Sequence, residues 1–431
     1  MRGAWVMGKP QTGDEYRGGG NGRMEGTLSM TDTATSPQAP ARDMRHCALF
    51  DRQIIYDNPH ETIIPEIHAG PAVFYADNVT LNQPGWVVRR AEDMRKIYAD
   101  TENYHKRGNT GFAKMIGEDW DIIPTELDPP VHTAYRSALN PLYAPSQMMK
   151  LDVKVRERAR ELIATFKDKG ECEFVQDFAV LFPITIFLEM IDLPVERLAQ
   201  FLEWENQMLR GTDRDIQIAS VRAVKELLTE TVADRRKNPG DDLISRTMTL
   251  EVDGRKWNDR EVFGHCFNLY LGGLDTVTAN LSLQFRHLAQ NPQDQQTMRT
   301  NTPSQNVVAV EELLRAYAAV STQRIVSKEH QIDGQTLLPG DVVSMSTPLA
   351  GRDPEAFENP QEVQFDRKPA HLTLGHSIHR CLGQHLARRE LQTAIEEFVK
   401  VMPMFSVQDG FRVPWMTGNI IQVTELPLRW G

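Results

Sequence analysis

The sequence contains little cysteine and no long apolar run. Its 431 residues include only four cysteines, which are widely scattered: Cys47, Cys172, Cys266 and Cys381. No stretch reaches the about 18 consecutive apolar residues that a membrane-spanning helix requires, so no membrane span is expected. Scattered single cysteines are typical of a reduced protein without disulfides. We therefore expect a cytoplasmic location.

An excess of basic residues is also missing. The 48 lysines and arginines are outnumbered by 59 acidic residues, which gives a formal net charge of −11. Together with the lack of an aromatic–basic cluster, this argues against nucleic-acid binding. No linker or repeat divides the chain after residue 46, so we expect one domain over residues 46–431 and a monomer. Residues 1–45 are rich in Gly, Ser, Thr and Pro without an apolar segment, which predicts a disordered tail.

Most of the remaining chain shows helical spacing of its apolar residues. Helices are expected over residues 153–169, 195–209, 216–238, 259–291, 305–319 and 382–401. Short strands are expected over residues 72–74, 85–88, 325–327, 342–345 and 420–426. The fold class is therefore mainly α with small peripheral β-sheets. The helix over 259–291 would span roughly 50 Å and cross the whole molecule.

Cys381 is the first candidate for chemistry. It precedes a helix start, where unpaired N–H groups and the helix dipole favour a thiolate. A thiolate binds a redox-active iron. Two alternatives remain open from the residues alone. A lone cysteine is usually a small buried hydrophobic residue, and several nearby histidines allow a zinc site, although their spacing is not that of a zinc motif. These are His371, His376, His379 and His385.

Three other segments carry candidate residues. Gly272 and Gly273 lie inside the predicted long helix and indicate close approach of another group to the backbone, while Asp275 and Thr276 follow directly. A Thr in a helix can bond its own i−4 carbonyl and open a groove. The alternative is simple packing by the two glycines.

The other two segments are weaker signals on their own. Glu312 and Arg315 form an i,i+3 pair, which by itself usually lies on the surface. His132 and Arg136 follow a proline turn and share one helix face, which suits a ligand with two negative charges. A solvated face is the default interpretation of such a pair.

The order and spacing of these motifs resemble the cytochrome P-450 superfamily, the haem-thiolate monooxygenases, from about residue 46 to 431. The segments that carry the resemblance are residues 127–136, 235–245, 271–277, 312–315 and 374–390. The chain is most similar to the bacterial camphor-hydroxylase group. Two departures occur: Leu374 and Ser377 stand where the family's cysteine loop usually has Phe and Gly.

The resemblance implies haem b as cofactor and a long central helix that crosses over it. Cys381 would be the iron ligand, and its thiolate would favour O–O cleavage. Asp275 would relay protons and Thr276 would bond the dioxygen, with Gly272 and Gly273 leaving room for the haem edge. Haem propionates would be held by His132, Arg136, Arg324 and His379. A structural triad behind the haem would consist of Glu312, Arg315 and Arg367.

The resemblance also implies an external electron donor, a [2Fe–2S] ferredoxin with its NAD(P)H-dependent reductase. Arg90 and Arg136 match cationic docking positions. The expected reaction is O₂-dependent hydroxylation of a small apolar cyclic terpenoid or norisoprenoid. A haem-thiolate sensor or carrier and a peroxide-driven peroxygenase are the alternatives. The substrate pocket would include Trp120, Thr125, Leu271, Val320, Thr322, Asn419 and Ile420.

The pocket position most unlike the camphor group is Trp120, which replaces the tyrosine that bonds camphor. Its larger ring is expected to point the indole N–H elsewhere. We therefore expect shape to orient the substrate and camphor to bind poorly.

Overall fold

A computed structural model describes residues 42–80 and 83–431, of which Asp43–Gly431 form one compact unit. Residues 1–41 of the predicted tail lie outside the described residues. Met44 and Arg45, which we assigned to the end of that tail, instead form strand β1 (Met44–Arg45) and pair in parallel with β3 (Val73–Thr80).

The structure is mainly α-helical with small sheets, as predicted. The helices are α1 (Ile63–His68), α2 (Ala91–Ala99), α3 (Phe112–Met115), α4 (Val131–Leu139), α5 (Pro145–Met149), α6 (Asp152–Ala164), α7 (Leu181–Met190), α8 (Leu198–Arg210), α9 (Arg214–Lys237), α10 (Leu243–Thr247), α11 (Asp259–Gly273), α12 (Thr276–Gln290), α13 (Pro292–Thr300), α14 (Pro303–Ala316), α15 (Thr347–Gly351) and α16 (Gln384–Val401).

Six strands form the largest sheet, in the order β1-β3-β4-β12-β9-β5. Its remaining members are β4 (Gln83–Val88), β5 (Tyr104–His105), β9 (Ser321–Val326) and β12 (Val342–Ser346). The short strands of the other sheets are β2 (Ile54–Ile55), β6 (Glu171–Glu173), β7 (Glu251–Val252), β8 (Arg255–Lys256), β10 (His330–Ile332), β11 (Gln335–Leu337), β13 (Phe405–Val407), β14 (Trp415–Met416), β15 (Gln422–Val423) and β16 (Pro427–Trp430).

Local capping explains where several helices begin. The Asp213 carboxylate accepts from two amides of the first turn of α9. Asn258 and Glu261 form a capping box at α11, and Thr302 and Gln305 form another at α14. Each device satisfies amide groups that the helix itself leaves unpaired. These helices position most of the side chains considered below.

The long helix predicted over residues 259–291 is two helices. α11 ends at Gly273 and α12 begins at Thr276, with Leu274 and Asp275 between them. The prediction missed α7, whose sequence is apolar on every side and therefore lacks helical periodicity. Seven of its ten residues are buried.

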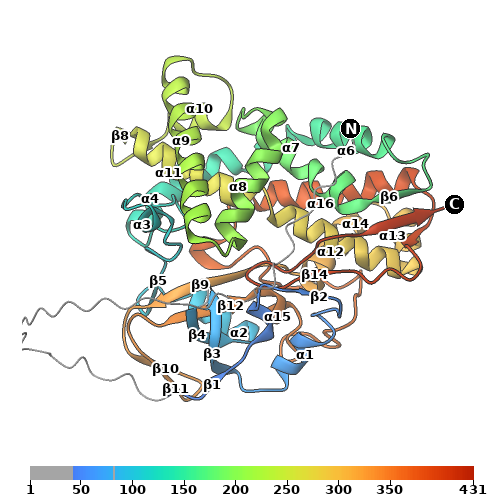
Figure 1. Cartoon of the computed structure of the whole chain (residues 1–431), viewed down its shortest axis with the longest axis horizontal. Coiled ribbons are helices and arrows are strands. Elements are labelled where there is room, and N and C mark those ends of the chain that lie inside the picture. Colours follow the sequence, from blue (N-terminus) through green and yellow to red (C-terminus); the bar gives the residue numbers. More distant parts are fainter. Residues whose placement is uncertain (1–41, 81–82) are drawn as a thin grey trace, which may run out of the picture. The chain divides into compact units, whose positions relative to one another are not determined.

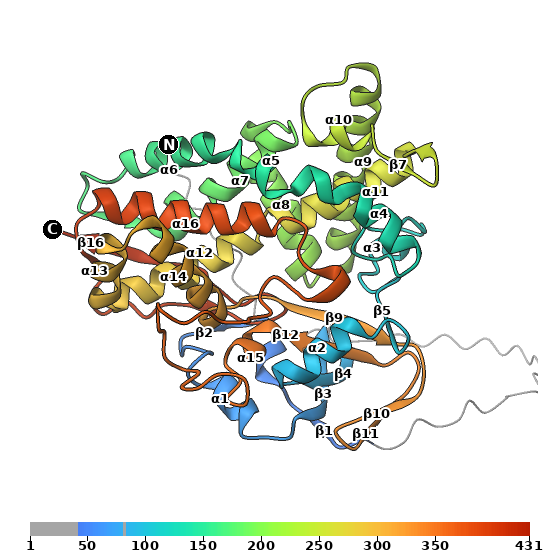
Figure 2. The same ribbon diagram turned by 180° about the vertical axis from the view of Figure 1, so that it is seen from behind.

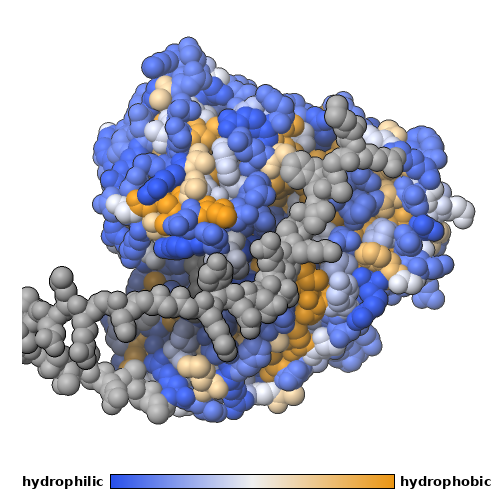
Figure 3. Space-filling view, in the orientation of Figure 1, coloured by the Kyte–Doolittle hydropathy of each residue, from blue (hydrophilic) through white to orange (hydrophobic). Residues whose placement is uncertain are grey.

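The helices and the large sheet occupy separate parts of this unit. Figures 1 and 2 show α6, α7, α8, α11, α12 and α16 packed together, while α1, α2 and α15 lie beside the sheet. The face drawn in Figure 3 is mostly hydrophilic, with apolar residues in scattered patches. None of the helices in the described part of the chain is both long and apolar enough to cross a membrane.

Candidate active site

The break between α11 and α12 forms the centre of the site. The Thr276 hydroxyl donates to the Gly272 carbonyl over 3.0 Å, the i−4 bond that the sequence predicted. A Cβ on Gly272 would meet nothing within 4 Å, so this turn borders open space. A Cβ on Gly273 would lie 2.5 Å from the Phe187 ring. Gly273 is therefore a packing position, and our assignment of it to the cofactor side is corrected.

Asp275 is buried and ion-paired. Its carboxylate accepts from Arg210, the last residue of α8. Glu205, one turn earlier on α8, is also buried, and its Oε1 has no hydrogen-bond partner among the described residues. Burial raises the Glu205 pKa well above its usual value, the negative Asp275 adds to that rise, and Arg210 opposes it. Asp275, the candidate for the proton relay, thus lies next to the Arg210 guanidinium and near the carboxyl group of Glu205.

Cys381 lies in a tight loop before α16. Its N–H donates to the Leu374 carbonyl over 2.7 Å, and Gly383 precedes the first helical residue. Burial raises the pKa of the thiol, while the Gly383 amide and three arginines lower it: Arg136, Arg388 and Arg380. The Gly383 amide at the helix start thus favours the thiolate as expected, but burial outweighs it and the net direction of the pKa is upward. A coordinated metal ion would ionise the thiol.

The two departures in the loop have different consequences. Ser377 has φ of 55°, the left-handed conformation that suits glycine, the residue usual there in the resembled family. Gly375 has a similar φ of 73°. Leu374 packs against the main hydrophobic core. Ser377 therefore carries local backbone strain within the loop.

Three basic side chains from distant segments lie near His379 of this loop, and we call the four residues the open cluster: Lys106, His132, Arg324 and His379. The rings of His132 and His379 lie 4.4 Å apart, centroid to centroid. Both ring nitrogens of His132 and Nη2 of Arg324 are buried without a hydrogen-bond partner. Arg324 Nη1 donates to the Gln323 carbonyl, and its guanidinium lies over the Tyr98 ring.

The electrostatics of the open cluster are unfavourable as it stands. Burial and the neighbouring cations lower the pKa of His132 to about 4 and that of Lys106 to about 7. Buried polar groups normally have partners, so these unpaired donors indicate a bound group that the chain does not supply. Their charge calls for an anion, preferably one with two carboxylates. Arg136 lies on the same helix face as His132 but bonds Asn140 through Nε over 2.8 Å.

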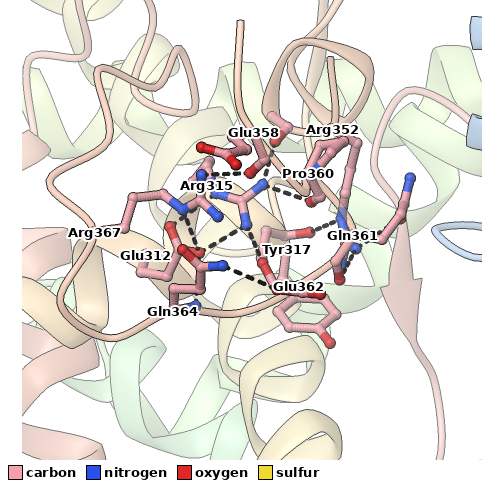
Figure 4. Close-up of polar contacts among 12 residues, drawn as sticks. Glu312, Arg315, Tyr317, Arg352, Glu358, Pro360, Gln361, Glu362, Gln364 and Arg367 are labelled. Carbon is pink, nitrogen blue, oxygen red and sulfur yellow. Dashed lines mark hydrogen bonds and ion pairs between the residues drawn. The ribbon is translucent and has the colours of Figure 1, made fainter. Parts of the chain in front are cut away.

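A second buried set, the closed network, consists of Glu312, Arg315 and Arg367 (Figure 4). The first two are 0% exposed and form a bidentate pair with both distances 2.8 Å. The remaining Arg315 hydrogens bond the carbonyls of Gly351, Pro360 and Glu362. Arg367 Nε lies 3.2 Å from Glu312. The surface interpretation of the Glu312–Arg315 pair is therefore wrong.

Trp120 is buried and its indole N–H is already engaged. The N–H donates to Glu118 over 2.9 Å, and Glu118 also accepts from Lys225. The ring packs against Phe263 and Phe267 at centroid distances of 5.0 and 4.6 Å. The indole N–H is therefore directed toward Glu118.

The other pocket candidates divide into two groups. Val320 and Ile420 face each other across a β-bridge and are half-buried, as is Leu271. Thr125 donates to the Asn268 side chain on α11. By contrast, the Thr322 hydroxyl bonds Tyr98, and the Asn419 amide bonds Thr80 and Gln323. The polar groups of Thr322 and Asn419 are satisfied within the protein, which corrects their assignment as polar pocket groups.

Arg90 does not present a free charge for docking. It pairs with Glu355 at 2.9 Å and with Asp333 at 3.3 Å. Burial lowers the pKa of Arg136, which lies near Cys381. The predicted docking pair is therefore reduced to Arg136, and the exposed Arg380 is a neighbour that we had not assigned.

The structure does not support the zinc alternative. Within residues 42–80 and 83–431, no three His, Cys, Asp or Glu side chains converge as metal ligands. His371 instead contacts Glu311 at 3.1 Å. Sequence reasoning also missed Lys106, Arg210 and Asn268. Asn268 had a signal, because it precedes Gly272 by four residues and so shares its helix face.

Comparison with known proteins gives consistent matches. The family model for cytochrome P450 matches residues 307–410. A curated relative from Sinorhizobium fredii named "Probable cytochrome P450 127A1" is 33% identical over 399 residues, 91% of this chain and 96% of its own. The crystal structure of cytochrome P450 CYP101C1 matches with a TM-score of 0.80 and 31% identity, over 91% of this chain and 98% of its own. That of CYP101J2 matches with the same TM-score and 29% identity, over the same shares.

Proposed function

Since the chain belongs to the cytochrome P450 family, whose members bind haem b through a cysteine thiolate, we propose that it hydroxylates a small apolar cyclic terpenoid or norisoprenoid with electrons from a [2Fe–2S] ferredoxin and its NAD(P)H-dependent reductase. The monooxygenase class follows from the family. The observation that carries the proposal is the broken central helix, where Asp275 and Thr276 adjoin the open space next to Gly272.

The open cluster fits haem b. Haem carries two propionate carboxylates, and the cluster offers the unpaired buried nitrogens of His132 and Arg324 with His379 and Lys106 beside them. Charge-assisted hydrogen bonds to carboxylates would satisfy these donors. Cys381, two residues after His379, would then hold the iron. Arg136 adds positive charge near the thiolate.

When bound, haem supplies the activation of O₂ and the insertion of one oxygen atom into a C–H bond. The protein must supply the protons that this reaction consumes. Thr276 donates its own hydrogen to Gly272, so its oxygen is left to accept a hydrogen bond from water. Asp275 would carry protons inward from solvent when its carboxylate leaves Arg210 and turns toward the open space beside Gly272.

An apolar substrate suits the pocket candidates. Leu271, Val320 and Ile420 are apolar and half-buried, and the Trp120 donor is engaged by Glu118. The matches to two CYP101 structures agree with the resemblance to the camphor group. Camphor itself would lack the phenol that bonds its carbonyl in that group, so ionone-like rings are favoured over camphor.

The ferredoxin proposal rests on the camphor-group resemblance and on local charge. Arg136 and Arg380 lie near Cys381, and Arg380 is exposed. A basic patch on the cysteine side would attract an acidic ferredoxin despite the net charge of −11. The retained Asp275–Thr276 pair favours this donor over the peroxygenase and sensor alternatives, neither of which needs a proton relay.

The test combines spectroscopy with reconstituted turnover. The ferrous–CO form should show the red-shifted Soret band of a thiolate ligand; Cys381→Ala should lose it, and the control Cys172→Ala should keep it. With ferredoxin, reductase and a terpenoid panel, Thr276→Ala should bind substrate yet divert electrons to peroxide. Protein without haem would overturn the proposal. Turnover supported equally by peroxide and unaffected by Thr276→Ala would favour the peroxygenase.

A further inference from the structure

Asn268 is a polar residue on the otherwise apolar stretch of α11 that leads to the helix break. Its neighbours along the chain are Phe267 and Leu269. The amide oxygen accepts from the Thr125 hydroxyl over 2.5 Å. Because the single hydroxyl hydrogen of Thr125 goes to the amide oxygen of Asn268, the amide nitrogen of Asn268 points away from Thr125. Thr125 thus orients the Asn268 side chain.

Asn268 lies on the face of α11 that borders the site. It precedes Gly272 by one helical turn, and residues four apart stack on one face. The Gly272 position opens onto free space, since a Cβ there would meet nothing within 4 Å. Asn268 is half-buried, and within the described part of the chain its amide nitrogen donates to no acceptor. The amide N–H₂ group of Asn268, whose hydrogens are free to donate, therefore adjoins the space beside the helix break.

The surroundings make this donor distinctive. The Trp120 N–H is bound by Glu118, the Thr322 hydroxyl by Tyr98 and the Asn419 amide by Thr80. Leu271, next to Gly272, is apolar. A ligand in this space would therefore meet apolar walls and one oriented amide donor. An unpaired donor covered by a ligand loses its water, so a ligand that offers an acceptor is favoured over one that does not.

We propose that Asn268, oriented by Thr125, is the polar anchor of the substrate pocket and selects cyclic terpenoids or norisoprenoids that carry one acceptor oxygen, such as a ketone, on an apolar skeleton. The inference rests on the proposed function and narrows its substrate class. Asn268 determines specificity through direct contact with the substrate, whereas Thr125 is a positioning residue. No chemical step is assigned to either.

The test is a cycle of two ligands and two proteins, read by haem spin-state titration. The probes are β-ionone and its analogue with methylene in place of the carbonyl oxygen; the proteins are wild type and Asn268→Leu. Wild type should bind the ketone about three- to tenfold more tightly than the analogue, the range expected for one neutral hydrogen bond. Asn268→Leu should abolish that preference and bind the analogue at least as well, which isolates the pairwise contribution.

Thr125→Val provides a second variant, which keeps the amide but removes the group that orients it. It should reduce the ketone preference to an intermediate value and leave binding of the analogue unchanged. A wild type that binds the ketone no better than the analogue, or an equal loss for both ligands in Asn268→Leu, would overturn the inference. An intact ferrous–CO thiolate band in all variants separates this outcome from failure of the proposed function, which would remove the band from wild type.

Discussion

The closed network and the open cluster are both charged and largely buried, yet only the Glu312–Arg315 pair of the closed network is complete, because Nη2 of Arg367 also has no hydrogen-bond partner among the described residues. Every N–H hydrogen of Arg315 has an acceptor within the chain, and Glu312 balances its charge. Arg324, 3% exposed, leaves Nη2 unpaired, and His132, 1% exposed, leaves both ring nitrogens unpaired. The difference distinguishes a part that folding alone requires from a part built for a group the chain does not contain.

Removing a charged side chain should change the free energy of unfolding in opposite directions in the two regions. Removing one partner from a complete buried ion pair leaves an uncompensated charge. Removing a cation that has no partner relieves a desolvation cost and repulsion among neighbours. The two regions can therefore be compared by substitution in the haem-free and haem-bound protein.

The largest effect is expected for Arg315→Ala. The substitution leaves Glu312 buried beside Arg367 without its bidentate partner, which commonly costs about 3–5 kcal/mol. Urea unfolding should show this loss with and without haem. The control is Lys96→Ala, which removes the exposed Lys96 ammonium from its i,i+3 pair with Asp93 and should cost less than about 1 kcal/mol. Equal losses in the two variants would contradict the importance of the closed network.

Arg324→Leu should separate the two regions. The haem-free protein should lose no stability, because a buried guanidinium without a carboxylate partner is removed. Haem binding should weaken at least about tenfold, since a hydrogen bond to a charged group contributes roughly 1.5–3 kcal/mol. Haem transfer to an acceptor protein measures the second effect and urea unfolding the first. A loss of unfolding free energy in the haem-free protein together with the loss of haem affinity would show that folding requires Arg324, as it requires the closed network.

The pH dependence of the haem-free protein sharpens the comparison further. His132 has its pKa lowered to about 4 by burial and by Arg136 and Arg324, with Asp128 opposing. Because the pKa of His132 is lower in the folded protein, the unfolded chain binds more protons than the folded chain between about pH 6.5 and about pH 4. The stabilising contribution of the neutral histidine is therefore fully present above about pH 6.5 and is lost as the pH falls toward about 4. Melting temperatures over this window should fall less steeply in His132→Gln. Superimposable curves would contradict the assigned pKa.

The smallest effect is expected for Ser377→Gly in the loop that carries His379 and Cys381. Ser377 adopts φ of 55°, and the left-handed conformation costs a non-glycine residue about 1 kcal/mol. The substitution should stabilise the protein by up to that amount without changing the ferrous–CO band. Gly383→Ala, outside the left-handed region, is the control and should not stabilise. A destabilised Ser377→Gly variant would show that the hydroxyl has a role of its own.

Several features were predictable from sequence because they depend on local patterns. The periodic helices α6, α8, α9, α14 and α16 lie within a few residues of their predicted ranges. The i−4 bond of Thr276 follows from the spacing of one hydroxyl and one carbonyl along a helix. The pairing of Glu312 with Arg315 also follows from spacing, but their burial does not. Burial depends on segments distant in sequence, such as the carbonyls of Gly351 and Pro360.

The sequence by itself determined the family, the mainly helical fold class and the position of the cysteine loop, because ordered motifs and apolar periodicity are properties of the chain. Only the tertiary structure decided which charges are compensated. Arg90 proved to be paired with Glu355, Lys106 joined the open cluster, and Asn268 met Thr125. Ion pairs and hydrogen bonds between distant segments depend on distances of a few ångströms, which no local pattern specifies.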